Sequence, residues 1–149
     1  MPFKSHMTQA LNEARAAARR DEVPVGAVLV SPDGRVIAAD GNRTRELNDP
    51  TAHAEIQTIR AACAALQTER LAGFDLYVTL EPCAMCAAAI AAARISRLYY
   101  AASDPKSGGV THGARVFSHP QSHHSPEIYD GIAATTAETI LRDFFRTKR

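Results

Sequence analysis

Stretches with the periodicity of helices alternate along this chain with short apolar runs that are typical of strands. The first stretch, residues 5–20, places Met7, Leu11 and Ala14 at helical spacing. Helical stretches also cover the residues from near 52 to 66, 83–93 and 135–149, and strand-like runs cover 25–30, 36–39, 75–80, 97–102 and 127–132. Because helices that alternate with strands pack on the faces of one sheet, the sequence predicts an α/β sandwich.

A Pro-Asp-Gly turn lies between the first two apolar runs. Ser31, Pro32, Asp33 and Gly34 end the first run, and the second begins almost at once, at Val36. Proline and glycine supply the backbone conformations that a tight turn needs, so the two runs are predicted to pair as a hairpin.

The second helix is expected to begin after a polar, loop-like stretch at residues 42–50. Thr51 can cap it near Ala52, because the threonine hydroxyl can accept a hydrogen bond from an early backbone N–H. Apolar residues then recur at helical spacing and predict the face that packs on the sheet: Ile56, Ile59, Cys63 and Leu66. A buried free cysteine behaves as a small hydrophobe, so Cys63 is assigned to the core.

Length and composition exclude several classes of protein. With 149 residues the chain fits one domain, residues 1–149, which can bury a core without disulfide bonds. A formal net charge of +1 gives no overall attraction to nucleic acid, so a polyanionic partner would have to meet a local basic patch. The sequence predicts no membrane span and no secretory signal, and its three cysteines favour a reducing compartment.

A pair of cysteines, Cys83 and Cys86, follows the strand-like run at 75–80. Residues three apart lie on one side of a helical turn, so both sulfur atoms can reach a single ion. The helix N-terminus favours the thiolate form, which is the form that binds metal. Sulfur ligands together with one imidazole select zinc, and His53, in the first turn of its own helix, is the best candidate for the third ligand.

Three protein ligands would leave the fourth position of zinc to water, as in catalytic sites. Glu55 lies two residues after His53, and at a helix terminus both side chains can border one pocket. A carboxylate there can take a proton from the water and hand it to a leaving group, which is worth roughly 100- to 10,000-fold in rate. The alternative is a closed structural site completed by a second histidine, such as His112, His123 or His124, and it leaves Glu55 without a role.

The order His-x-Glu followed by Pro-Cys-x-x-Cys matches the signature of zinc deaminases that act on nucleobases. Further segments carry a closer resemblance: 23–28 (VPVGAV), 41–42 (GN), 49–55 (DPTAHAE), 77–83 (YVTLEPC), 104–108 (DPKSG) and 144–146 (FFR). Through them the chain resembles the bacterial tRNA-specific adenosine deaminases of the cytidine/deoxycytidylate deaminase superfamily. The resemblance implies a three-layer α/β/α sandwich with a five-stranded mixed sheet and helices on both faces.

The same resemblance implies hydrolysis of adenosine to inosine at the wobble position of a tRNA anticodon. Zinc-activated hydroxide would attack adenine C6 with Glu55 as the proton shuttle, and one zinc ion would be bound per chain without an organic cofactor. The residues implied to contact the substrate are Asn42, Asp104, Lys106, Phe145 and Arg146. A homodimer and a cytoplasmic location are also implied.

The end of the last helical stretch supports a nucleic-acid contact independently. Arg142, Arg146, Lys148 and Arg149 surround the Phe144-Phe145 pair, and such a helix end offers phosphate contacts and a stacking face. The alternative is a core-packing aromatic pair with a solvated basic tail.

Two other functions use the same motifs. A deaminase of a free base or nucleoside, of the guanine or cytosine type, would need the zinc site but not the basic aromatic tail. A non-catalytic RNA-binding domain stabilised by zinc would predict a saturated metal and a dispensable Glu55. The stretch 103–125, which contains four histidines, is long for a loop and is expected to be functional or to carry structure of its own.

Overall fold

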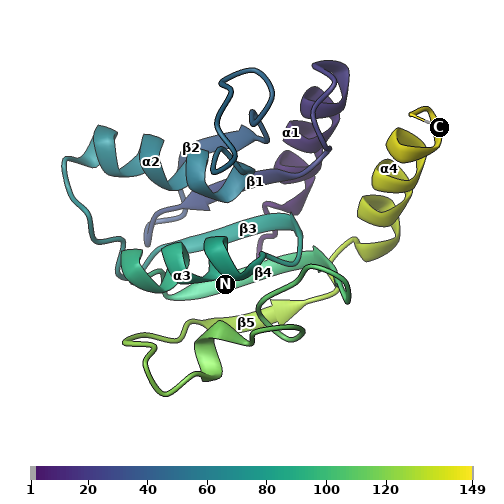
Figure 1. Ribbon diagram of the computed structural model, residues 1–149. Coiled ribbons are helices and arrows are strands. Elements are labelled where there is room, and N and C mark those ends of the chain that lie inside the picture. The colour runs from purple at the N-terminus through teal and green to yellow at the C-terminus, as the bar shows by residue number, and fades with distance from the viewer. Residues whose placement is uncertain (1–2, 149) are drawn as a thin grey trace.

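The computed structural model describes residues 3–148 (Figure 1). Along the chain its elements are α1 (Met7–Arg19), β1 (Gly26–Val30), β2 (Val36–Gly41), α2 (Ala54–Leu66), β3 (Asp75–Leu80), α3 (Ala84–Ala93), β4 (Arg97–Ala102), the 3-10 helix η1 (Val116–Ser118), β5 (Glu127–Asp130) and α4 (Ala134–Arg146). No helix in this part of the chain is long and apolar enough to cross a membrane.

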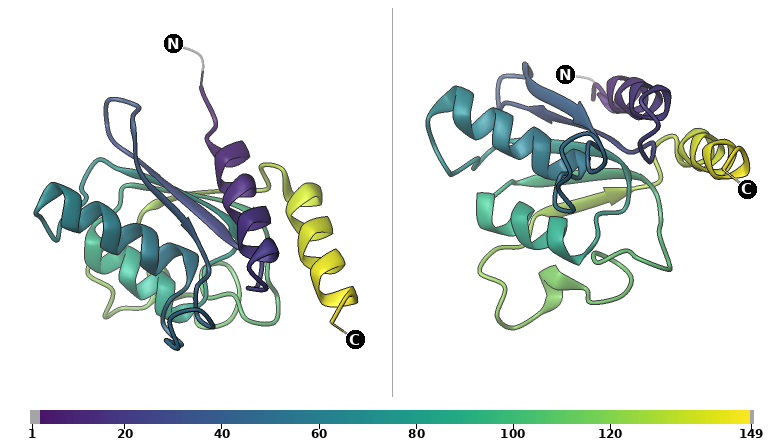
Figure 2. Two further views of the ribbon diagram at one scale, coloured as in Figure 1. Left: turned by 90° about the horizontal axis from the view of Figure 1, so that it is seen from above. Right: turned by 45° about the horizontal axis from the view of Figure 1, so that its top comes forward.

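The five strands form one mixed sheet in the order β2-β1-β3-β4-β5. β1 pairs antiparallel with β2, as the turn signal predicted, and also with β3, whereas β3, β4 and β5 run parallel. α2 and α3 cover one face of the sheet and α1 and α4 cover the other, where the two helices lie side by side (Figure 2). This arrangement confirms the predicted three-layer α/β/α sandwich.

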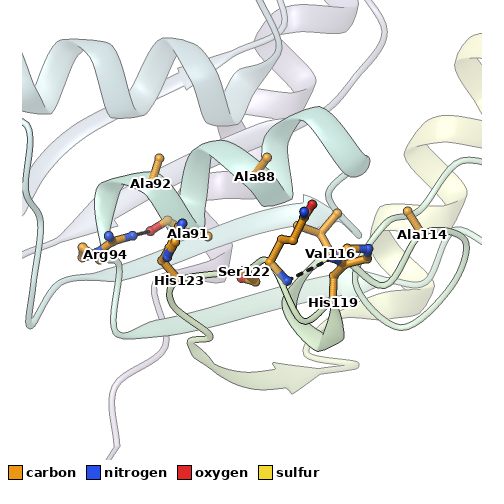
Figure 3. Close-up of a pocket in the computed structure, with 10 residues that line it drawn as sticks. Ala88, Ala91, Ala92, Arg94, Ala114, Val116, His119, Ser122 and His123 are labelled. Carbon is orange, nitrogen blue, oxygen red and sulfur yellow. Dashed lines mark hydrogen bonds between the residues drawn. The ribbon is translucent and has the colours of Figure 1, made fainter.

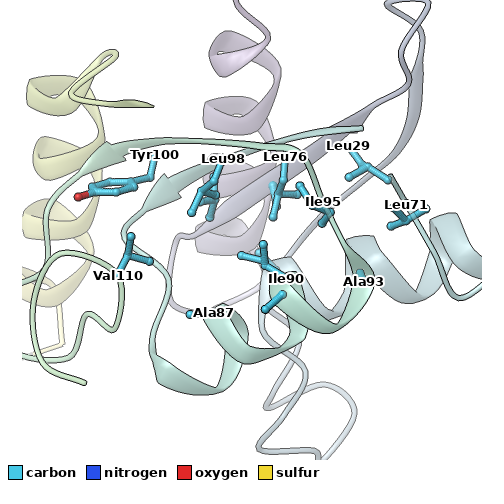
Figure 4. Packing of buried hydrophobic residues seen from close by; sticks show 14 of the residues in the cluster. Leu29, Leu71, Leu76, Ala87, Ile90, Ala93, Ile95, Leu98, Tyr100 and Val110 are labelled. Carbon is cyan, nitrogen blue, oxygen red and sulfur yellow. The ribbon is translucent and has the colours of Figure 1, made fainter. Parts of the chain in front are cut away.

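Two hydrophobic clusters, one on each face, hold the layers together. The larger cluster lies between the sheet and α2–α3 and joins Leu76 and Leu98 of the strands to Ile90 of α3 (Figure 4). The other cluster joins Met7 and Leu11 of α1 to the opposite face. β1 is buried along its whole length, since it has helices on both sides, and this explains its continuous apolar run.

Gly26 lets α1 lie directly on β1. A Cβ atom at this position would stand 2.0 Å from the carbonyl oxygen of Ala10 and 2.5 Å from the backbone nitrogen of Ala14. The backbones therefore approach more closely than any side chain permits, and the start of β1 is fixed beside the pocket described below.

Helix α2 corrects two of the sequence predictions. It begins at Ala54 rather than near Ala52, with His53 as its N-cap residue. Thr51 does not cap it, because its hydroxyl and its N–H both donate to Asp49 Oδ1, at 2.7 and 2.8 Å, and close a turn before the helix.

The predicted apolar face of α2 was also partly wrong. The residues that are buried beneath α2 are small or polar: Ala54, Glu55, Thr58 and Ala62. Ile59 and Cys63 pack against the margin of the core, but Leu66 is 41% exposed. Small and polar residues therefore form the inner side of α2, and its larger apolar residues lie at the margin of the core or in solvent.

The observed ends of the other helices and strands differ from the predicted ones by a few residues. β5 ends at Asp130 and is an exposed edge strand, and α4 ends at Arg146, while Arg149 lies outside the described residues. The long stretch 103–125 carries only η1 as regular structure, and η1 packs beside α3.

Candidate functional site

The N-termini of α2 and α3 meet beside the end of β3. His53 and Cys83 are the N-cap residues of the two helices, and Cys86 lies in the first turn of α3. Nδ1 of His53 lies 3.6 Å from Sγ of Cys83 and 3.4 Å from Sγ of Cys86. The structure therefore brings together the three residues that the sequence offered as metal ligands, with their ligand atoms within 4.8 Å of one another.

This donor set fits a zinc ion. Nitrogen and sulfur ligands at ordinary zinc distances and tetrahedral angles are about 3.6 Å apart, which agrees with the two distances from His53. His112 and His124 do not complete a closed site, since His112 contacts Glu81 and Nε2 of His124 contacts the carbonyl oxygen of Ile95.

The two thiols have opposite tendencies to ionise. The hydrogen bond with Cys86 lowers the pKa of Cys83 to about 4, and the contact with His53 acts in the same direction. The same bond and burial raise the pKa of Cys86, and the bond to Cys83 raises the pKa of His53. Binding of a cation would displace these protons, because thiolates and neutral imidazole are the ligating forms.

Glu55 is buried against this cluster, with 3% of its surface exposed. Burial raises the pKa of its carboxyl group to about 7. Its Oε1 atom is buried and has no hydrogen-bond partner among the described residues. Because a buried polar atom without a partner is costly, this oxygen is available to a group that enters the pocket, and a pKa near neutrality suits proton transfer.

A cavity of about 270 Å³ is lined by His53, Glu55 and Cys83. Its wall also contains Val23, Val25, Asn42, Thr44, Leu80, Glu81, Asp104 and Ser107. The volume lies at the small end of ligand pockets and suits one planar base held between apolar and polar walls.

Two further buried glutamates hold the loops that form the rim of this cavity. Glu22 accepts hydrogen bonds from the N–H groups of Arg45 and Glu46, at 3.1 and 2.8 Å. Glu81 accepts from the loop that begins at Asp104. Burial alone would raise the pKa of Glu81, but hydrogen bonds from that backbone and from His112 hold it below the usual value.

The predicted substrate residues fall into two groups. Asn42 and Asp104 line the cavity, and Oδ1 of Asn42 also accepts a hydrogen bond from the N–H of Ala54, at 2.8 Å, at the start of α2. Lys106 is exposed on the Asp104 loop, outside the cavity lining.

The other predicted contacts, Phe145 and Arg146, are exposed at the end of α4, on the opposite face of the sheet. Lys148 pairs with Asp21, which also pairs with Arg45 at 2.9 Å in the loop that follows Asn42. Two exposed ion pairs therefore connect the basic helix end to the loop at the rim of the cavity.

Several pocket residues were not predicted. Val23, Val25 and Leu80 are apolar walls, and Thr44 and Ser107 are polar ones. All of these except Thr44 lie in segments that carried the family resemblance, which was the one signal that could have found them.

Known proteins resemble this chain over almost its whole length. Residues 2–149 match the profile of the MafB19-like deaminase family. A tRNA-specific adenosine deaminase of Agrobacterium fabrum is 66% identical over 150 residues, which cover 100% of this chain and 98% of the relative.

Solved structures are similar as well. One, from studies of A-to-I editing by tRNA:A34 deaminases at the wobble position of transfer RNA, is 66% identical, with a TM-score of 0.89 over 91% of this chain and 97% of the other. A guanine deaminase of Bacillus subtilis is 30% identical, with a TM-score of 0.65 over 97% and 95%.

We predict that Cys86→Ser lowers the zinc content, because serine oxygen is a poor substitute for a thiolate ligand. Cys63→Ser is the matched control, since Cys63 lies on α2 outside the ligand cluster. Mass spectrometry of metals should find one zinc per chain in the unsubstituted protein and in the control, and a small fraction of that in Cys86→Ser. Equal zinc in both variants would contradict the site.

Proposed function

Because this chain belongs to the tRNA-specific adenosine deaminases, we propose that it hydrolyses adenosine to inosine at the wobble position of a tRNA anticodon. The observation that carries the proposal is a free, buried carboxylate oxygen on Glu55 beside a His-Cys-Cys cluster, in a cavity of base size. Structural zinc sites use four protein ligands, whereas a cluster of three beside a carboxylate suits hydrolysis.

The residues divide the chemistry between them. His53, Cys83 and Cys86 would hold zinc, which when bound lowers the pKa of water so that a nucleophile is available at neutral pH. The Glu55 carboxylate accepts a proton from the attacking water and delivers it to the amino nitrogen that leaves C6 of adenine as ammonia. Its pKa of about 7 lets it change protonation state twice in each turnover.

The cavity walls hold the base in place for this transfer. Val23, Val25 and Leu80 supply apolar walls for the ring, and Asn42 and Asp104 provide polar groups for the target nucleotide. Because Glu55 is held on a helix and faces the C6 edge of the base, little entropy has to be lost to orient the two groups for the transition state.

The tRNA substrate is proposed to reach beyond the cavity to the basic end of α4. Arg142 and Arg146 are exposed there, and Phe145, at 46% exposure, offers a ring to an unpaired base. Lys106 extends the basic rim on the Asp104 loop. A cytoplasmic location follows from a tRNA substrate and is part of the same proposal.

A free purine base is the second candidate substrate. The observation in its favour is the guanine deaminase likeness at 30% identity, since fold and metal motif do not determine the substrate. The basic, aromatic end of α4 distinguishes the two candidates, because a base alone has no phosphates to meet it.

A homodimer is the third part of the proposal. Beside α3 lies an apolar hollow of about 310 Å³ between that helix and the loop after Ala114 (Figure 3). Ala88 and Ala92 are exposed and belong to its lining, and Leu66 is exposed on the neighbouring α2. Small residues let a second helix approach closely, so this side of α2–α3 suits a second copy of the chain.

We expect the protein to convert adenosine to inosine in a transcribed tRNA with adenosine at the first anticodon position. Glu55→Gln should lower the rate by roughly 100- to 10,000-fold while zinc stays bound, because an amide cannot carry the proton. Sequencing reads the inosine, guanine and cytidine serve as parallel substrates, and Glu69→Gln, at an exposed position, is the matched control. Conversion of guanine without conversion of tRNA would favour the second candidate.

Replacing Arg142 and Arg146 together by alanine should weaken tRNA binding and its dependence on salt. Removal of one phosphate-binding side chain reduces the slope of log K against log salt by about 0.7–0.9. The substitution preserves the packed residues of α4, which truncation of the helix would remove, and circular dichroism checks that α4 remains folded. An unchanged KM and slope would rule out the basic helix end as a tRNA contact.

Light scattering should give a mass twice the 16.1 kDa of one chain. Ala92→Glu places a charge in the apolar hollow and should yield monomers, whereas Thr136→Glu adds the same charge on the exposed side of α4 and should leave the dimer intact. A dimer that persists in Ala92→Glu would place the interface elsewhere.

A further inference from the structure

The carboxylate of Glu81 is the anchor of the loop that forms one wall of the cavity. Glu81 follows the last residue of β3, and its N–H donates to the carbonyl oxygen of Ala102, at 2.8 Å, so its backbone is held at the end of the sheet. None of its side-chain surface is exposed. A buried charge is tolerated only where it is fully hydrogen-bonded.

Five donors surround this carboxylate, and all come from the loop. Oε1 accepts from the N–H of Asp104 at 3.0 Å and lies 2.7 Å from Nδ1 of His112. Oε2 accepts from the N–H groups of Val110, Thr111 and His112, at 3.1, 2.9 and 3.1 Å. Hydrogen bonds to an ionised acceptor are about twice as strong as neutral ones, so one side chain joins both ends of the 104–112 loop.

The loop is also packed tightly against Glu81. A Cβ atom on Gly108 would lie 2.5 Å from the Glu81 carboxylate, and one on Gly109 would lie 2.5 Å from the backbone nitrogen of Ala84, at the start of α3. Only glycine allows this approach. The loop backbone is thus held between Glu81 and the helix that carries Cys86.

Asp104 links the restrained loop to the wall of the cavity. Its Oδ1 accepts hydrogen bonds from the N–H groups of Lys106 and Ser107, at 3.2 and 3.0 Å, so the position of Asp104 determines that of the turn. Asp104 and Ser107 both line the cavity.

Glu81 itself is not suited to carry a proton. A carboxylate has about four lone-pair sites, and here five donors compete for them, whereas the nearby Glu55 has a free oxygen. The two buried acids of the cavity therefore have different tasks.

We propose that Glu81 is a positioning residue for the deamination, which holds the Asp104–Ser107 wall against the substrate base through the backbone of the 104–112 loop. The predicted effect on KM rests on the proposed function, whereas the predicted restraint of the 104–112 loop does not. Loss of a wall that contacts substrate and transition state alike raises KM and leaves kcat nearly unchanged.

Glu81→Gln tests the proposal, because glutamine keeps the shape but turns one acceptor into a donor that faces N–H groups. With an anticodon stem-loop as substrate, kcat/KM should fall by about tenfold, the effect of about one lost hydrogen bond to the substrate, and mainly through KM. Zinc content should stay at the level of the unsubstituted protein. His112→Ala, which removes one of the five donors from an accessible position, should raise KM by a smaller factor.

Leu71→Ala is the matched control for stability alone, since Leu71 is fully buried before the start of β3, at the end of the strand away from the site. Leu71→Ala should lower the melting temperature at least as much as Glu81→Gln does, but its KM should change by less than about twofold. A KM increase in Leu71→Ala equal to that of Glu81→Gln would overturn the positioning role.

Hydrogen exchange gives a readout that needs no substrate. In Glu81→Gln the amides of Asp104, Val110 and Thr111 should exchange at least about tenfold faster, while the amides of β1 and β3 keep their protection. Unchanged exchange at these amides would overturn the proposal even if tRNA deamination is observed. Faster exchange in a protein that does not deaminate tRNA would support the anchor and reject the proposed function instead.

Discussion

The site depends on two helices that start at the same place. α2 and α3 pack side by side on one face of the sheet, and Nδ1 of the α2 N-cap residue, His53, lies 3.6 Å from Sγ of the α3 N-cap residue, Cys83. Both helix dipoles thus present their positive ends to the thiols, which favours the thiolate needed for a metal. Any shift of one helix along the sheet would separate the ligands, so the packing of small residues such as Ala54 and Ala87 is a condition for the site as well as for the core.

Three buried glutamates near this point show how neighbouring acids acquire different properties. Glu22 and Glu81 accept hydrogen bonds from loop backbones, and Glu55 leaves one oxygen without a partner. A carboxylate whose oxygens accept several hydrogen bonds holds its donors in place, whereas burial raises the pKa of a carboxylate with a free oxygen, such as Glu55, so that it can exchange protons. The rim of the cavity is fixed by the first kind, and the proposed reaction uses the second.

The sequence was most informative where a local pattern decides the structure. Periodicity located the helices and strands, and the spacing of Cys83 and Cys86 put both sulfur atoms on one helical turn. It failed for Leu66, because a helical pattern identifies apolar residues without telling which of them face the sheet. The role of Glu81 could not be derived from sequence, since its donors lie more than twenty residues further along the chain and meet it only after β4 has paired with β3.

A rigid rim has a consequence for the recognition of RNA. The loops at Thr44 and Asp104 are already held by Glu22 and Glu81, so binding need not order them, and that entropic cost is avoided. The conformational change then falls on the substrate, which must extrude one base into the cavity. Extrusion costs a few kcal/mol from a duplex and least from an unpaired loop. A preformed, base-sized cavity beside a basic helix end therefore favours a base in a single-stranded loop over one in a stem, and the phosphates around that base distinguish it from a free purine.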